Sequence, residues 1–307
     1  MVVARSPLPL VSIARARVAR AFLTLLVLVG LGAGLAQPRA VVDDLGREVD
    51  VPAAALRIVA MMPTHAETVC ALGACDRLIG VDAFSNHPAE VQDLPSLGSP
   101  FDADVEAIVA LEPDLVLADE YSGLAEALAR LGVPVYAGTA QTIDDIWEVT
   151  REVGTLLGLE AEAAVLVGRT QGRLAALAAR SGGSEGRSVF VEIDATPYSV
   201  GPDSFLGSLL TLAGARNIVP AGLGDFPQVD PELVIEADPD LLLLLDAPYG
   251  ETAARVAARP GWGGLRAVRS GAVIEATRAE VDLLTRAGPR VADALELLQR
   301  WLASSPR

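Results

Sequence analysis

The chain has 307 residues, 51% of them apolar, with 40 acidic against 24 basic residues and a formal net charge of −16. This length exceeds the size at which one hydrophobic core keeps growing, so we expect two domains of about 110–130 residues each. The acidic balance, with no basic stripe to override it, excludes nucleic acid and anionic lipid surfaces as partners.

The first 36 residues differ in kind from the rest. An apolar run at residues 21–31, followed by small residues at 34–36, is preceded by Arg5, Arg15, Arg17 and Arg20. This pattern predicts an export signal at residues 1–36, cleaved after Ala36, with an uncleaved membrane anchor as the alternative. No Cys follows the run, which argues against a lipid anchor. Cleavage would change the formal charge from −16 to −20 and leave a periplasmic or otherwise extracytoplasmic soluble protein.

A sixteen-residue unit occurs twice. The segment DVEAIVALEPDLVLAD at 104–119 returns as DPELVIEADPDLLLLL at 230–245, with six identities at an offset of 126. Asp104 and Asp230 stand where a helix N-cap belongs, and Pro231 at the first helical position. The apolar runs that follow do not alternate, as expected of parallel strands buried on both faces.

The rest of the chain alternates strands and helices in the same way. Strands are predicted at 57–61, 77–81, 114–118, 133–137, 189–193, 241–245 and 272–276, and helices at 64–72, 122–131, 204–213, 231–237, 252–258 and 288–302. The pattern predicts an α/β protein of two doubly wound lobes, each with a central parallel sheet, joined by a long interdomain helix. The expected divisions are an N-terminal lobe at 41–141, a helical linker at 142–186 with its long helix at 160–180, and a C-terminal lobe at 187–307.

Aromatic residues gather where a ligand would bind. In open α/β sheets, ligands bind outside the carboxyl ends of the strands. Four predicted strands are followed by an aromatic residue, and two more aromatics precede the repeated helices; the six are Phe84, Tyr121, Tyr198, Tyr249, Phe101 and Phe226. Loop packing explains any one of them but explains the set less well, so we predict a ligand-binding cleft between the lobes.

Catalytic motifs are missing from the sequence. It contains no G-x-S-x-G elbow, no Walker loop and no G-x-G-x-x-G after a strand. Asp119, Asp194 and Asp225 could pair as carboxylates of a hydrolytic enzyme, but no nucleophile or base accompanies them. We therefore expect a binding protein that is not an enzyme.

Cysteine and histidine are scarce. Cys70 and Cys75 could form a disulfide or remain two buried thiols, and the spacing does not decide between them. His65 and His87 are the only histidines, too few for a His-rich transition-metal site, although carboxylates could complete a ligand set. We predict neither a metal site nor a cofactor.

Several segments together resemble the class III substrate-binding proteins of ABC importers, the vitamin B12, ferric siderophore and haem family with a helical interdomain backbone. The resemblance covers about residues 57–302. It is carried by the linker and by RIVAMMPTHAETVCALGACDRLIGVDAFSNHPAEV, DVEAIVALEPDLVLA, GGLRAVRSGAVIEA and LTRAGPRVADALELL.

The resemblance implies a membrane partner. In this family one glutamate on each lobe docks into arginine pockets of the permease dimer, which works with its ATPase subunits, and these glutamates match Glu106 and Glu232. Without the resemblance, the alternative interpretation is that Glu106 and Glu232, as acids in the first turns of two equivalent helices, compensate the helix dipoles. We expect a monomer that docks on the permease through this pair.

The resemblance also implies where a ligand would stack. Phe84 matches a ligand-stacking Tyr of the vitamin B12 binders, and Phe226 in DFPQV a stacking Trp. The Trp that precedes the first repeat in those proteins is replaced here by the Pro100–Phe101 region.

A corrinoid, large and held by flat apolar contacts, suits the aromatic loops best. Tricarboxylate siderophores would need several arginines. Only Arg278 and Arg286 are near, and Arg286 has a structural interpretation, holding the last helix. Haem would need an axial donor, for which Tyr121, His65 and His87 are candidates. Haem and a neutral hydroxamate siderophore remain alternatives.

Overall fold

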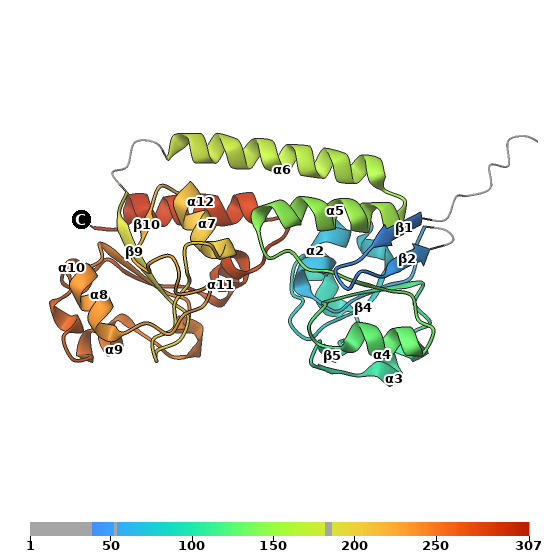
Figure 1. Ribbon diagram of the computed structural model, residues 1–307, viewed down its shortest axis with the longest axis horizontal. Helices are drawn as coiled ribbons and strands as arrows, with labels where there is room; N and C mark the ends of the chain where they lie inside the picture. Colours follow the sequence, from blue (N-terminus) through green and yellow to red (C-terminus); the bar gives the residue numbers. More distant parts are fainter. Residues whose placement is uncertain (1–38, 52–53, 182–185, 307) are drawn as a thin grey trace, which may run out of the picture. The chain divides into compact units, whose positions relative to one another are not determined.

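The computed structural model describes residues 39–51, 54–181 and 186–306, so the expected export signal lies outside the described residues. The described part contains two four-stranded parallel sheets, with strand orders β4-β3-β7-β8 and β10-β9-β11-β12 (Figure 1). The predicted fold class is confirmed. Among the described helices, none combines the length and apolar character needed to span a membrane.

The N-terminal lobe (residues 39–137) is built on the first sheet. Its strands are β3 Ile58–Ala60, β4 Leu78–Val81, β7 Leu115–Ala118 and β8 Val135–Ala137, and its helices are α2 Pro63–Ala71, α3 Val105–Ala110 and α4 Leu124–Arg130, with short 3-10 turns η1 Cys75–Arg77 and η2 Ala89–Asp93. Two antiparallel hairpins were not predicted: β1 Arg39–Val42 with β2 Glu48–Val51, and β5 Gly98–Ser99 with β6 Asp102–Ala103.

The C-terminal lobe (residues 188–306) repeats the plan. Its strands are β9 Ser188–Glu192, β10 Arg216–Asn217, β11 Leu241–Leu244 and β12 Val273–Glu275. Its helices are α7 Phe205–Leu212, α8 Pro231–Ala237, α9 Ala253–Ala258, α10 Arg266–Ser270, α11 Arg278–Thr285 and α12 Val291–Ser304, with 3-10 turns η3 Ala247–Tyr249 and η4 Trp262–Gly264. The sequence did not predict α10 and α11.

The two copies of the repeated unit adopt the predicted local structure. The Asp104 side chain accepts a hydrogen bond from the Ala107 N–H and the Asp230 side chain from the Glu232 N–H, both at 2.9 Å, which starts α3 and α8. Each helix leads into a strand, β7 or β11, that is buried along its whole length. Both strands occupy the third place in their sheets.

Two helices, rather than one, join the lobes. Helices α5 Ile143–Leu157 and α6 Glu160–Arg180 meet at Gly158, whose φ of +69° a glycine adopts without strain. The start of α5 packs in the core of the C-terminal lobe and its end in the core of the N-terminal lobe. Helix α6 crosses between the same cores in the opposite order, against α5 and α12 (Figure 1).

Of the two alternatives for the cysteines, a disulfide or two buried thiols, the structure has the disulfide. Cys70 and Cys75 form a disulfide, with their Cα atoms 4.1 Å apart, that ties the end of α2 to η1. Disulfides persist in oxidising compartments, which agrees with an exported protein.

Candidate functional site

The aromatic residues of the described part fall into two groups. Six are buried: Tyr136, Trp147, Phe190, Phe205, Trp262 and Trp301. The other six are exposed, from 39% at Tyr198 to 79% at Phe101, and they are the six that the sequence analysis singled out: Phe84, Phe101, Tyr121, Tyr198, Phe226 and Tyr249, here called the strand-end aromatics. Large exposed apolar side chains gain less from folding than buried ones do, so a group of them is a candidate binding surface.

In the N-terminal lobe, loop contacts bring two of these rings to neighbouring segments. Asp82, directly after β4, accepts hydrogen bonds from the Phe84 N–H at 2.7 Å and the Ser85 hydroxyl at 2.5 Å, which fixes the turn that carries Phe84. The Ala83 N–H donates to the Gly98 carbonyl at 2.9 Å and so joins this turn to the β5–β6 hairpin. Phe101 occupies the tip of that hairpin.

The C-terminal lobe pairs its loops in the same way. The Ser199 and Gly201 N–H groups donate to the carbonyls of Pro227 and Asp225 at 3.0 and 2.8 Å, so the segments carrying Tyr198 and Phe226 run together. A Cβ at Gly201 would lie 2.0 Å from the Gly224 carbonyl oxygen, so only glycine permits this approach. In both lobes the loop before the repeated helix is thus hydrogen-bonded to a loop that follows a strand and carries a second aromatic.

Tyr249 and Arg278 form one unit. Tyr249 ends η3, directly after β11, and Arg278 opens α11. The guanidinium lies 5.2 Å from the Tyr249 ring centroid, donates a hydrogen bond to its hydroxyl, and pairs with Asp282 at 3.6 Å. Half of the Arg278 side chain remains exposed, so it can still contact a ligand.

An ion-pair cluster joins the two lobes beside these residues. Glu67 on α2, 3% exposed, accepts hydrogen bonds from Arg286 at 2.9 Å and from Arg290 at 2.6 and 2.8 Å. We call Glu67, Arg286 and Arg290 the interlobe cluster. Arg286 also donates to the Phe84 carbonyl at 3.0 Å and pairs with Asp282 at 3.2 Å.

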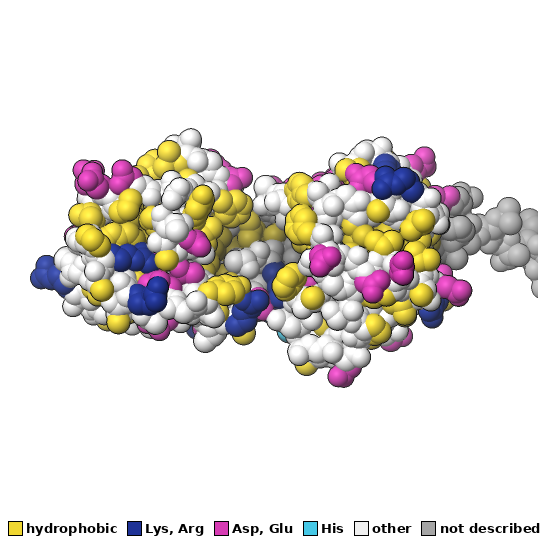
Figure 2. Space-filling view, turned by 90° about the horizontal axis from the view of Figure 1, so that it is seen from below, with side chains coloured by type: hydrophobic (Ala, Val, Ile, Leu, Met, Phe, Trp, Pro, Cys, Tyr) yellow, Lys and Arg dark blue, Asp and Glu magenta, His cyan; other side chains and the backbone are white. Residues whose placement is uncertain are grey.

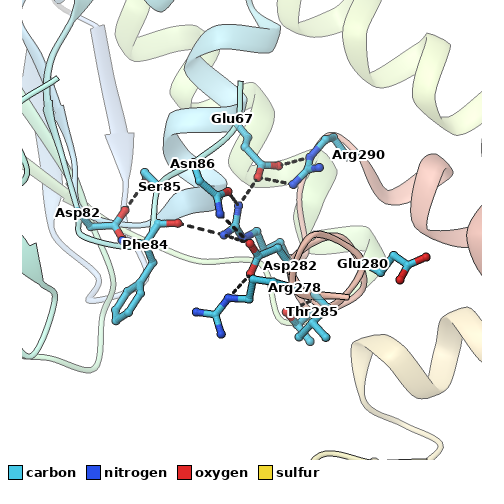
Figure 3. Close-up of polar contacts among 12 residues, drawn as sticks. Glu67, Asp82, Phe84, Ser85, Asn86, Arg278, Glu280, Asp282, Thr285 and Arg290 are labelled. Atoms are coloured by element: carbon cyan, nitrogen blue, oxygen red, sulfur yellow. Dashed lines mark hydrogen bonds and ion pairs between the residues drawn. The ribbon is translucent and has the colours of Figure 1, made fainter. Parts of the chain in front are cut away.

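Figure 3 shows how the site residues lie around this cluster. The Phe84 ring and the Arg278 guanidinium extend to the same side of it in that view. Figure 2 shows Lys or Arg side chains beside the hollow between the lobes, with hydrophobic side chains on both flanks. Arg286 was expected to hold the last helix. It instead holds the end of α11 to Glu67 of the other lobe, so its guanidinium is already paired.

The acids proposed for an enzyme instead order the loops. Asp119 Oδ1 accepts from the Tyr121 and Ser122 N–H groups at 2.7 and 2.6 Å, and Asp194 Oδ1 accepts from Thr196. The hydrogen bonds from Thr196 hold the pKa of Asp194 below its ordinary value, whereas the neighbouring Glu120 carboxylate raises the pKa of Tyr121 to about 12. Asp225 is exposed in the loop that carries Phe226.

The two histidines have different surroundings. His65 is buried, with Nε2 2.8 Å from the Gly138 carbonyl oxygen, and burial lowers its pKa. His87 lines a cavity of about 470 Å³ together with Arg169 and Arg173 of α6. Glu67 and Arg290 of the interlobe cluster also line that cavity, but none of the strand-end aromatics does, and we therefore do not assign it as the ligand site.

Glu106 and Glu232 are both exposed, in the first turns of α3 and α8. Their placement suits a contact with a partner protein, and it also suits dipole compensation.

A comparison with protein families matches residues 58–279 to the periplasmic binding proteins. The chain belongs to this family. Its class is that of the vitamin B12, haem and siderophore binders of ABC transporters, and its members are solute-binding proteins rather than enzymes.

Three similar proteins show the range of this class. The ABC transporter substrate-binding lipoprotein YvrC of Bacillus subtilis (strain 168) is 29% identical, covering 85% of this chain and 84% of that protein. A cobalamin-binding protein of Halobacterium salinarum is 31% identical, covering 61% of this chain and 53% of that protein. The structure of the periplasmic heme-binding protein RhuT from Roseiflexus sp. RS-1 is 26% identical with a TM-score of 0.72, covering 80% of this chain and 97% of that one. The chain is thus a substrate-binding protein of an ABC importer, and its relatives are periplasmic or lipoprotein binding proteins.

Proposed function

We propose that this protein binds a corrinoid of the cobalamin type outside the cytoplasm and delivers it to an ABC importer. The observation that carries the proposal is the division of the aromatic residues, because every exposed ring of the described part lies in a loop at a strand end or before a repeated helix. Flat apolar faces on both lobes suit a large ligand that is mostly uncharged. The similarity to the cobalamin-binding protein supports the same ligand class.

The charges beside the rings favour this ligand over an anionic one. Arg286 is occupied by Glu67 and Asp282, which leaves Arg278 as the half-exposed guanidinium next to Tyr249. A tricarboxylate siderophore would need several such groups, whereas a corrinoid or a neutral hydroxamate siderophore would not. The ferric hydroxamate therefore remains an alternative within the same site.

Haem is the second candidate, and one observation favours it. Tyr121 is an exposed phenol at a strand end and could serve as an axial ligand, as in the tyrosine-ligated haem proteins. His65 is buried and His87 lines the cavity beside α6, so neither is placed to serve the same ligand.

We further propose that Glu106 and Glu232 contact the permease dimer, which acts with its ATPase subunits, and that the protein works as a monomer. One carboxylate on each lobe would let a single partner contact both lobes at once. Because the two residues lie outside the aromatic loops, docking and ligand binding should separate in mutants.

Replacing an aromatic face should weaken binding without unfolding the chain. We expect Phe84→Ala and Phe226→Ala each to lower cyanocobalamin affinity by roughly 1–3 kcal/mol, because each removes one stacking face. Calorimetric titration measures the loss, and Val165→Ala, an exposed apolar residue on α6, is the matched control. Unchanged affinity in both aromatic variants would refute the site.

Ligand binding should move the lobes little. Two helices pack into both cores and the interlobe cluster bridges them, so we expect a rotation of about ten degrees or less rather than wide closure. X-ray scattering with and without cyanocobalamin tests this, and a large fall in the radius of gyration would contradict it.

A further inference from the structure

Three buried carboxylates meet at the carboxyl edge of the second sheet. Glu192 ends β9, Asp246 follows β11, and Glu251 precedes α9, with exposures of 0%, 6% and 6%. One oxygen from each can be chosen so that all three lie within 4.8 Å of one another. Two calcium–oxygen distances of about 2.4 Å span such a gap.

The protein supplies too little positive charge for this cluster. Arg259 donates to both oxygens of Glu192 at 2.5 and 2.6 Å and lies 3.2 Å from Glu251. Arg255 reaches the other oxygen of Glu251 at 3.3 Å, but its side chain is 70% exposed and is screened by water. Three carboxylates against one sheltered guanidinium leave an excess of about two negative charges, which is costly away from water.

A second observation points to a ligand. Asp246 Oδ1 is buried and has no hydrogen-bond partner among the residues that the structure describes. A buried carboxylate oxygen normally accepts at least one hydrogen bond or binds a metal. We propose that Glu192, Asp246 and Glu251 bind a hard divalent cation, with Ca²⁺ the best fit because it takes oxygen ligands in flexible geometry.

The site would be structural and would go beyond the proposed transport function. Asp246 opens the short η3 turn that ends in Tyr249, and the Tyr249 N–H donates to the Asp246 carbonyl at 2.9 Å. A cation at Asp246 would therefore brace the turn that carries one of the strand-end aromatics. Arg259, stacked 4.7 Å from the Trp262 ring centroid, fixes the opposite side of the cluster.

A proton is the competing occupant. Burial first, and then the neighbouring Glu192 carboxylate, raises the pKa of Asp246 to about 7. With a proton alone, the folded state would be most stable in acid and would lose stability as the pH rises from about 4 to 7, with no response to metal. A cation predicts the reverse preference, because it binds the ionised carboxylates.

The test is the melting temperature of EDTA-dialysed full-length mature protein at pH 7.5, with and without CaCl₂, MgCl₂ or MnCl₂. We expect Ca²⁺ at about a hundredfold above its Kd to raise the Tm by roughly 5 °C. The rise should vanish in Asp246→Asn and persist in Glu236→Gln, an exposed acid of the same lobe. The metal-free Asp246→Asn protein should melt no lower than metal-free wild type, because the change removes a repelling charge.

Four results would overturn the proposal. One is that the Tm does not respond to any of the three ions but falls between pH 5 and 7, and that Asp246→Asn abolishes this fall. That result would mean that a proton, rather than a cation, occupies the cluster. Another is an equal rise in all variants, which would assign diffuse binding to the acidic surface. If Asp246→Asn fails to fold, native mass spectrometry of wild type and of Glu251→Gln is the deciding experiment. The absence of one bound Ca²⁺ in wild type would refute the site, and so would full retention of that ion in Glu251→Gln.

Discussion

Reversing both proposed docking charges, in the variant Glu106→Arg with Glu232→Arg, is expected to abolish uptake and leave ligand binding nearly intact. Both carboxylates are exposed in first turns and lie outside the aromatic loops. If the permease presents arginines to them, like charges at two contacts would cost several kcal/mol of docking free energy. Dipole compensation predicts instead a stability loss of up to about 1 kcal/mol per helix and no special transport defect.

The control for this experiment keeps the same change in charge. Glu48→Arg with Glu236→Arg also reverses one exposed acid in each lobe, and it should transport normally. Uptake in cells, a melting curve and a ligand titration are measured for both variants. Normal uptake by the first variant would refute the docking role of Glu106 and Glu232.

Removing the carboxylate of the interlobe cluster should cause the largest loss of stability. Glu67→Gln leaves Arg286 and Arg290, whose side chains are 10% and 22% exposed, without their shared anion. Breaking a buried pair in this way typically costs about 3–5 kcal/mol. Arg290 would lose the carboxylate that pairs with it, whereas Arg286 would keep its pair with Asp282. We also expect weaker ligand binding, since Arg286 holds the Phe84 carbonyl.

An exposed ion pair between α6 and α12 provides the comparison. Asp293 pairs with Arg173, and both side chains are 45% exposed, so Asp293→Asn should cost about 0–1 kcal/mol. Urea unfolding midpoints of the two variants measure the difference. If Glu67→Gln loses no more than Asp293→Asn, the interlobe cluster does not stabilise the arrangement of the lobes.

The repeated unit could be predicted from the sequence because its signals are local. Asp104, Asp230 and Pro231 mark the helix starts within a few residues of the strands they precede, and the structure has each where it was predicted. The strand-end aromatics could be found for the same reason, since a parallel sheet brings the ends of its strands to one edge.

The interlobe contacts could not be predicted because their partners lie far apart in the chain. Glu67 lies in α2 among residues of mixed polarity, and nothing near it indicates that Arg286 and Arg290 would reach it from the connection between α11 and α12. Helix α11 had a usable signal, the capping box of Thr277 with Glu280, but its short length gave little periodicity. The carboxylates of the proposed cation site are likewise brought together only by the sheet.

The β1–β2 hairpin was missed because its two antiparallel strands are only four residues long and resemble loop sequence. Gly46, with a φ of +71°, and Asp43, which accepts from the Leu45 and Arg47 N–H groups, form its turn. Those turn residues are typical of a hairpin. The apolar alternation on either side of them was too brief to predict two strands.

The central claim is that the strand-end aromatics bind a corrinoid. Calorimetric titration of the purified mature protein with cyanocobalamin, haemin and ferrichrome, each in separate runs, tests it most directly. We predict one site per chain for cyanocobalamin, at least tenfold tighter than for the other two ligands and weakened by Phe84→Ala. No heat with cyanocobalamin, together with saturable one-site binding of haemin or ferrichrome, would contradict the assignment and transfer the site to that ligand.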